Sequence, residues 1–138
     1  MTMSNTVISG AALVRAADAM LRAIGGDTIT LAFALVTLAN DPSAQLGLAD
    51  PEVQEVPLFP VVVRNLPSPN TGPRRRLEFL ISSTAVDATV VSQNAASAES
   101  LFDSALGLSY DGDLFHIESV ISEYFAGTKY MYKVTAVE

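Results

Sequence analysis

The chain has 138 residues, of which 49% are hydrophobic and 17% are charged, and its formal net charge is −7. This length and apolar content predict one folded domain over residues 1–138 with a buried core. The negative charge disfavours general binding to nucleic-acid phosphates. The absence of cysteine excludes disulfides, a thiolate nucleophile and cysteine-ligated metals. A mean hydropathy of +0.33 leaves two interpretations open: apolar surface covered by partners, or a core rich in alanine and valine.

No segment predicts a membrane span or a secretion signal. The longest apolar run, residues 29–39, is interrupted by Thr30 and Thr37 and falls short of the roughly 18 residues that a span requires. The N-terminus lacks the basic region, apolar core and small-residue cleavage site of a signal peptide. We therefore expect synthesis in the cytoplasm and no membrane partner.

An amphipathic helix is predicted over residues 9–25, after a loose arm over residues 1–8. Ser9 can cap the first turn, and Gly25 and Gly26 can end the helix. The apolar residues recur at the spacing of one helical stripe: Leu13, Ala17, Met20, Leu21 and Ile24. We expect this stripe to pack across a sheet or over the end of a barrel.

The first strand is predicted over residues 27–37, with alternate apolar residues on one face: Ile29, Leu31, Phe33 and Leu35. A long acidic loop follows over residues 40–55, interrupted by two prolines. It contains no basic residue, and its acids are Asp41, Asp50, Glu52 and Glu55. A loop of this length in a small domain is usually functional or mobile, so these four acids are candidate interaction residues.

The middle of the chain predicts two further strands and a short helix. A strand over residues 57–65 leads into a turn-rich loop over residues 65–75, which should project. The third strand follows, with Leu77, Phe79 and Ile81 on one face. Residues 85–91 either extend this strand or bend away from it. Residues 97–106 then predict a short helix that Ser97 caps and Gly107 ends.

The last 29 residues, from Tyr110 to Glu138, predict two long strands joined by a turn at Gly127. In the first strand one face should hold Phe115, Ile117, Ser119 and Ile121; in the second it should hold Tyr130, Tyr132, Val134 and Ala136. The chain thus has five or six strands that each need one buried face. Such a set predicts a mostly β fold, a small antiparallel β-barrel or sandwich with one N-terminal α-helix and long projecting loops.

Catalytic motifs are not evident in the sequence. His116 is the only histidine, and no serine has the flanking glycines of a nucleophile elbow, so a structural or surface role is favoured for it. Asp111 and Asp113 resemble the start of a calcium loop, but a strand begins at once, which favours a hairpin turn. We predict no catalytic, cofactor-binding or metal-binding residue, and no enzymatic activity.

One basic cluster, Arg74, Arg75 and Arg76, stands beside a long acidic stretch. Seven acidic residues and no lysine or arginine lie between Thr84 and Thr128. The cluster is either a solvated strand start or a contact for an acidic neighbour. In a ring built head to tail, the basic loop of one copy could meet the acidic surface of the next.

Three segments resemble the small head–tail connector proteins of tailed bacteriophages, the stopper or head-completion proteins. They are Arg76-Leu-Glu-Phe-Leu-Ile-Ser-Ser-Thr-Ala-Val86, Gly112-Asp-Leu-Phe-His-Ile-Glu-Ser-Val120 and Gly127-Thr-Lys-Tyr-Met-Tyr-Lys-Val134. The resemblance covers roughly residues 74–138. It lies in a strand that ends in small residues, a strand that follows Gly-Asp, and a final strand with Tyr-x-Tyr.

The resemblance implies a small β-barrel that forms a homo-oligomeric ring in the virion neck, between the portal or adaptor and the tail. Such a ring retains packaged DNA, which passes through its lumen without sequence-specific binding, and offers a docking surface to the tail. A tail terminator, or another tail structural ring protein, is the alternative within this class. A small ligand-binding or enzymatic barrel that uses His116 and nearby carboxylates is the alternative from another class.

Overall fold

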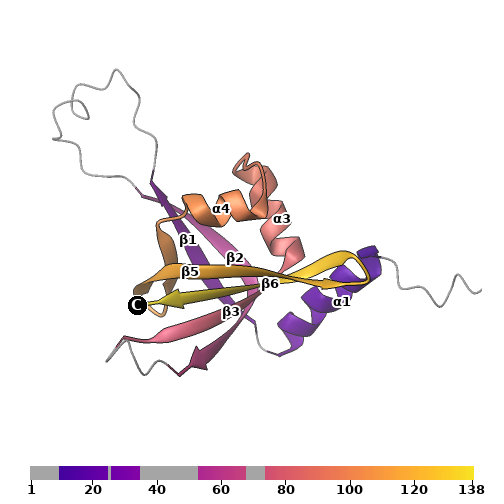
Figure 1. The fold of residues 1–138 in the computed structure, drawn as a ribbon, viewed down its shortest axis with the longest axis horizontal. Helices are drawn as coiled ribbons and strands as arrows, with labels where there is room; N and C mark the ends of the chain where they lie inside the picture. Colours follow the sequence, from indigo (N-terminus) through magenta and orange to yellow (C-terminus); the bar gives the residue numbers. More distant parts are fainter. Residues whose placement is uncertain (1–9, 25, 35–52, 68–73) are drawn as a thin grey trace, which may run out of the picture.

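Six antiparallel strands close into a barrel in the order β1-β2-β3-β6-β5-β4, with β4 returning to β1 (Figure 1). The computed structural model describes residues 10–24, 26–34, 53–67 and 74–138. The strands are β1 (Asp27–Ala34), β2 (Val53–Leu66), β3 (Arg76–Ser82), β4 (Gly107–Tyr110), β5 (Asp113–Phe125) and β6 (Thr128–Val137). The described helices are α1 (Gly10–Ala23), α3 (Ser83–Ser92) and α4 (Ala98–Ser104).

The predicted mostly β fold with an N-terminal helix is confirmed, and the barrel is closed. The inward faces of β1 and β6 are those that the alternation predicts, because Ile29, Leu31, Tyr132 and Val134 are all buried. Aromatic rings fill the interior, and Phe79 meets the ring of Phe115 edge-on at 6.1 Å between centroids. Leu35 lies outside the described residues.

Residues 83–92 form helix α3, so the expectation that residues 85–91 might extend β3 is wrong. Three valines and a threonine in residues 85–91 favour a strand locally. The structure instead turns the chain at Ser82, whose Oγ accepts a hydrogen bond from Ala85 N at 3.2 Å and so caps the helix. Val86 and Thr89 then become buried against the barrel, and this packing outweighs the strand propensity.

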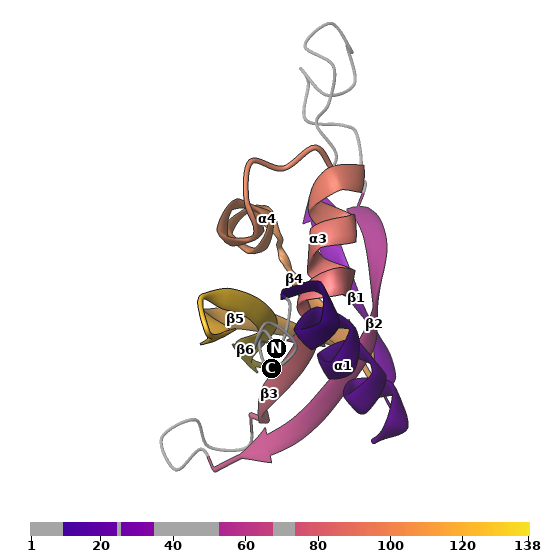
Figure 2. The ribbon, with the colours of Figure 1, turned by 90° about the vertical axis from the view of Figure 1, so that its right-hand side faces the viewer.

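Helix α4 is confirmed with Ser97 as its cap, but it ends at Ser104, and Gly107 begins the short strand β4 instead of ending the helix. The C-terminal part of the barrel therefore contains three strands, β4, β5 and β6, where the sequence predicts two. Gly107 is needed because a β-carbon there would lie 2.5 Å from the Phe115 carbonyl oxygen on β5. Figure 2 shows α3 and α4 on the same side of the barrel, with α1 crossing below α3.

A β-bulge in β5 breaks the predicted alternation. Ile117 pairs with Ala136, but Ser119 already pairs with Thr135, so Glu118 is an extra residue on β5. The bulge turns Val120 toward the core and leaves Ile121 exposed. The prediction that Ser119 and Ile121 share the face of Phe115 is therefore wrong.

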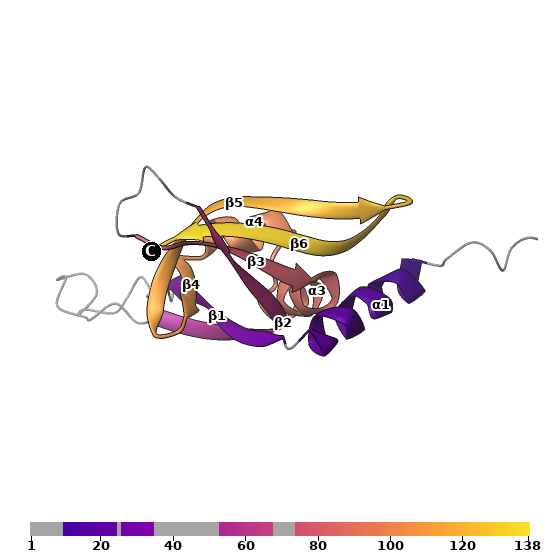
Figure 3. The same cartoon turned by 90° about the horizontal axis from the view of Figure 1, so that it is seen from below.

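Helix α1 packs on β2, β3 and β6, within the predicted span of residues 9–25. Only Leu21 of its stripe is buried; Met20 and Ile24 remain exposed. Figure 3 shows the β5–β6 hairpin running past the rest of the sheet above the start of α1. The two elements touch there, since a β-carbon added to Gly10 would lie 2.9 Å from Thr128 Oγ1.

The strand β2 begins earlier than the sequence predicts. Glu55 therefore lies in a strand, opposite Ala32 of β1, and the predicted loop over residues 40–55 is too long at this end. Asp41, Asp50 and Glu52 lie outside the described residues, as do residues 1–8. Strand β2 also continues to Leu66, so the loop predicted over residues 65–75 begins later than expected.

The two serine caps give a matched test of the fold. Ser82 is buried and also donates to Asp18 Oδ1 at 2.9 Å, whereas Ser97 caps α4 in solvent. We expect Ser82→Ala to lower the free energy of unfolding by about 2 kcal/mol or more, because it removes a cap and a bond to a carboxylate. Ser97→Ala should cost about 1 kcal/mol. Urea unfolding measures both, and equal losses would contradict this role of Ser82.

Candidate functional site

Arg75 is the centre of an ionic cluster at one end of the barrel. Its Nε lies 2.8 Å from Glu138 Oε2, its Nη1 lies 3.7 Å from Asp111 Oδ2, and its Nη2 pairs with Asp113. The guanidinium also lies over the Phe115 ring, 5.1 Å from the centroid. The cluster thus ties the start of β3, the β4–β5 turn and the end of the chain together.

The hydrogen bond to Glu138, supported by the charges of Glu138, Asp113 and Asp111, raises the pKa of Arg75 above its ordinary value. A second bond joins the same two ends of the chain, from Glu138 N to the Arg75 carbonyl at 2.9 Å. Arg75 is therefore permanently charged and held in place.

Neighbouring arginines on the outer face of the sheet pair in the same way. Arg76 Nε lies 3.0 Å from Glu118 Oε2, so the bulged residue of β5 is tied to β3. Arg64 and Glu78 form an ion pair directly across β2 and β3. Arg74 lies just before Arg75, at the entry to β3.

The basic cluster and the acidic stretch predicted to meet between copies therefore meet within one chain. Asp111, Asp113 and Glu118 all belong to the acidic stretch, and their partners are Arg75 and Arg76. Replacing these arginines by glutamate would break ion pairs within the chain. Such variants would therefore lose stability whether or not the arginines contribute to an interface. The segregation of charge along the sequence is explained by strand pairing and needs no second subunit.

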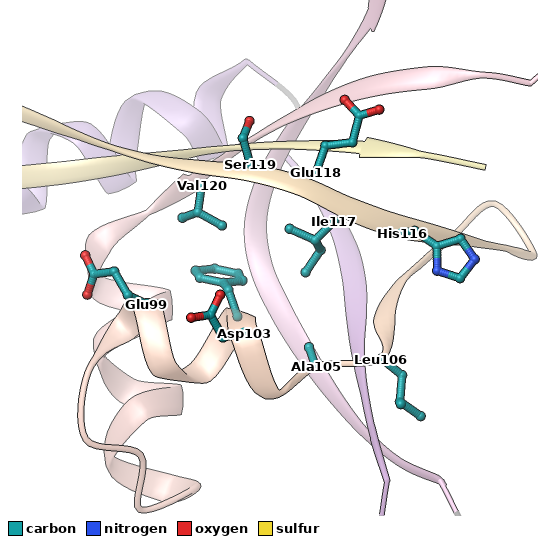
Figure 4. Close-up of a pocket in the computed structure, with 10 residues that line it drawn as sticks. Glu99, Asp103, Ala105, Leu106, His116, Ile117, Glu118, Ser119 and Val120 are labelled. Carbon is teal, nitrogen blue, oxygen red and sulfur yellow. The ribbon is translucent and has the colours of Figure 1, made fainter. Parts of the chain in front are cut away.

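A surface groove of about 460 Å³ runs between α4 and β5. Figure 4 shows Ile117 and Val120 on the side of β5 that faces α4, with Glu118 and Ser119 on its other side. His116 and Glu99 lie at opposite ends of the groove. The sequence gives no sign of this groove, because its two walls come from a helix and a strand that tertiary packing brings together.

The groove does not assemble a catalytic constellation from the described residues. Glu118 is paired with Arg76, and Glu99 is held by Lys129 at 3.5 Å. No hydrogen bond in the described part of the chain joins His116 to a serine or a carboxylate, and no group of three or more potential metal ligands occurs there. The imidazole is exposed on the strand, and none of the described residues orients it.

Lys129 lies near the tip of the β5–β6 hairpin, opposite Tyr124, and holds this tip against α4. Its Nζ lies 5.0 Å from the centroid of the Tyr132 ring and 5.7 Å from that of Tyr124, besides its contact with Glu99. The hydrogen bond with Tyr132 raises the pKa of Lys129, and burial raises the pKa of the Tyr132 phenol. The tip of the hairpin is therefore tied to α4.

The half of β5 that leads to the turn exposes large apolar side chains. Ile121, Tyr124 and Phe125 are 52%, 59% and 55% exposed. A group of exposed apolar residues on one projecting element marks an interaction surface more often than it marks ordinary solvent-exposed surface. We call these three residues the hairpin patch. The hydrophobic alternation alone could not locate it, because the bulge at Glu118 decides which residues of β5 face outward.

The chain matches no protein-family model, no curated protein sequence and no solved structure. In the described ranges, no helix has both the length and the apolar character needed to cross a membrane.

The ionic cluster predicts a salt-dependent contribution to stability. Arg75→Gln should lower the free energy of unfolding, and the loss should shrink as salt is added, because exposed charges are screened. Arg15→Gln provides the control, since Arg15 is exposed on α1 and makes no ion pair with the described residues. Urea unfolding at low and high salt measures the difference. Equal effects of the two substitutions at low salt would contradict the role of Arg75.

Proposed function

We propose that this protein is a structural subunit of a tailed-phage virion neck, a connector of the stopper class that assembles as a ring. The observation that carries the proposal is the hairpin patch. A two-stranded hairpin that extends past its barrel and exposes an isoleucine, a tyrosine and a phenylalanine is costly in an isolated monomer, and burial against a neighbour would remove that cost.

The interior of the barrel supports a scaffolding role. Phe79, Phe115 and Tyr132 fill it together with aliphatic side chains, and all three are buried. Small barrels of this kind have room for side chains and little else. Function is therefore more naturally carried on the outer surface, where the hairpin patch and the groove lie.

The segments that resemble connector proteins are neighbours in the barrel. They correspond to β3, β5 and β6, which lie in the order β3-β6-β5. The resemblance thus falls on one continuous half of the barrel, which includes the projecting hairpin. This supports assigning the resemblance and the hairpin patch to the same role.

In the proposed ring the chain sits between the portal or adaptor and the tail, retains DNA and docks the tail. A net charge of −7 suits a lumen through which DNA slides, because it repels phosphate. A tail terminator would share the ring and the charge. The two roles differ in the partner bound: the portal–adaptor complex for a stopper, and the end of the tail tube for a terminator.

Assembly through the hairpin patch is testable by solution mass. We expect the full chain to form a ring in light scattering after size exclusion, and Tyr124→Glu with Phe125→Glu to reduce it to a monomer, because the charges would be buried in the interface. Val91→Glu is the matched control: Val91 is 80% exposed on α3, away from the hairpin, so the ring should persist. A ring that survives the double substitution, or a wild-type chain that stays monomeric even with portal–adaptor complexes, would contradict the proposal.

His116 distinguishes assembly from a ligand-binding barrel. Because the imidazole is exposed and unsupported, we expect His116→Ala to change the free energy of unfolding by less than about 0.5 kcal/mol and to leave the solution mass unchanged. Denaturant unfolding and light scattering measure both. A small molecule that co-purifies with the wild-type chain and is lost from the variant, as seen by native mass spectrometry, would favour the ligand-binding barrel.

A further inference from the structure

One edge of β5 is open along most of its length. Strand β4 has only four residues and pairs with β5 at residues 113–115 alone. From residue 116 to residue 125, β5 pairs only with β6 on its other side. Within the described ranges no other backbone group bonds to this edge. Ten residues of strand therefore present outward-facing N–H and C=O groups without a partner in the described chain.

The other long free edge of the sheet carries prolines, and this one does not. Residues 53–60 of β2 lie beyond the reach of β3, which pairs only with residues 61–66, and they contain Pro57 and Pro60. Proline removes a ladder donor, and natural sheets use proline and lysine to block unwanted pairing. Residues 116–125 of β5 contain neither residue type. The bulge at Glu118 interrupts this edge, and the stretch that follows it is a template for strand addition.

The groove lies along the first half of this open edge, where residues 116–120 line it. Ile117 and Val120 form its apolar floor, and Phe102, Ala105 and Leu106 contribute to the wall on the side of α4 (Figure 4). A strand added to β5 would place alternate side chains over this floor and between it and α4. The groove thus offers backbone hydrogen bonds and apolar contacts together, the combination that recognises an extended peptide.

The acidic side chains beside the groove favour a peptide that carries basic residues. The only charged side chains of α4 are the carboxylates Glu99 and Asp103, and no lysine or arginine lines the groove. Glu99 is paired with Lys129, but Asp103 is exposed and has no ion pair with the described residues. The edge segment itself adds Glu118 and Glu123, which are paired with Arg76 and Lys133. Among the described residues, Asp103 is therefore the carboxylate of the groove that has no ion pair, and it favours a basic partner.

We propose that the open edge of β5, residues 116–125, with the groove beside α4, binds an extended segment of a partner protein that alternates apolar and lysine or arginine side chains. The segment adds to the sheet as a strand next to β5. Its apolar side chains cover Ile117 and Val120, and its basic side chains meet Asp103. This inference does not require ring formation, but the edge segment includes the three residues of the hairpin patch, so the test is made on the dilute, monomeric chain.

The test uses the full chain and a synthetic ten-residue peptide of alternating lysine and valine, with a glutamate–valine peptide of the same length as its counterpart. Amide hydrogen exchange is followed residue by residue. We expect the lysine peptide to slow exchange of the outward-facing amides in residues 116–125, and the glutamate peptide to leave them unchanged. Asp103→Lys should weaken binding of the lysine peptide about fivefold. Glu55→Lys, the same charge change in β2, should leave it unaltered.

Three results would overturn the proposal. The lysine peptide could bind without slowing exchange in residues 116–125, which would show attraction without strand addition. Both peptides could protect the edge equally, which would remove the charge preference. The edge amides could already be protected in the free chain in a concentration-dependent manner, which would assign the edge to a second copy. A ring that forms while the edge stays unprotected by the lysine peptide would separate failure of this inference from failure of the proposed function.

Discussion

The structure depends on how β4 closes the barrel. Four residues join β1 to β5: residues 107–109 pair with residues 30–32 of β1, and residues 108–110 pair with residues 113–115 of β5. Gly107 permits this, because β5 passes too close for a side chain. The closure seals a core of aromatic and aliphatic side chains at one end. Since β4 is so short, the rest of β5 is left with one open edge, and the hairpin continues past the barrel.

Ion pairs stabilise the end of the barrel that β4 closes. Arg75 joins β3 to the β4–β5 turn and to Glu138, and Arg76 joins β3 to the bulge in β5. The basic cluster is thereby used within the chain, so contacts between copies in the proposed ring would rely on other surfaces. The surfaces proposed for partners are instead the hairpin patch and the open edge of β5.

The sequence predicts the elements whose side chains obey a simple period. Strands β1 and β6 are buried on one face along their length, so alternation identifies Ile29, Leu31, Tyr132 and Val134 correctly. Helix α1 and the Ser97 cap follow from local signals in the same way. Helix α3 does not, because its β-branched residues favour a strand, and burial of Val86 against the barrel decides otherwise.

The candidate surfaces were less accessible to sequence reasoning. The bulge at Glu118 exists only in relation to β6, so no inspection of β5 alone could show that Ile121 faces outward. The Arg75–Glu138 pair joins residues 63 positions apart, and the arginines therefore look free in the sequence. The groove beside α4 likewise needs the helix and the strand placed in space. In each case the missing information is the tertiary neighbour.

Amide hydrogen exchange on the dilute, monomeric chain tests the central claim most directly. β4 pairs only with residues 113–115 of β5, and residues 116–125 have β6 as their only partner, so exchange should alternate between slow and fast along residues 116–125. Along residues 131–137 of β6, which have β3 on one side and β5 on the other, exchange should be slow at every amide. Uniformly slow exchange along the whole of β5 would mean that the edge is already covered within the chain, and the account of an open assembly end would be wrong.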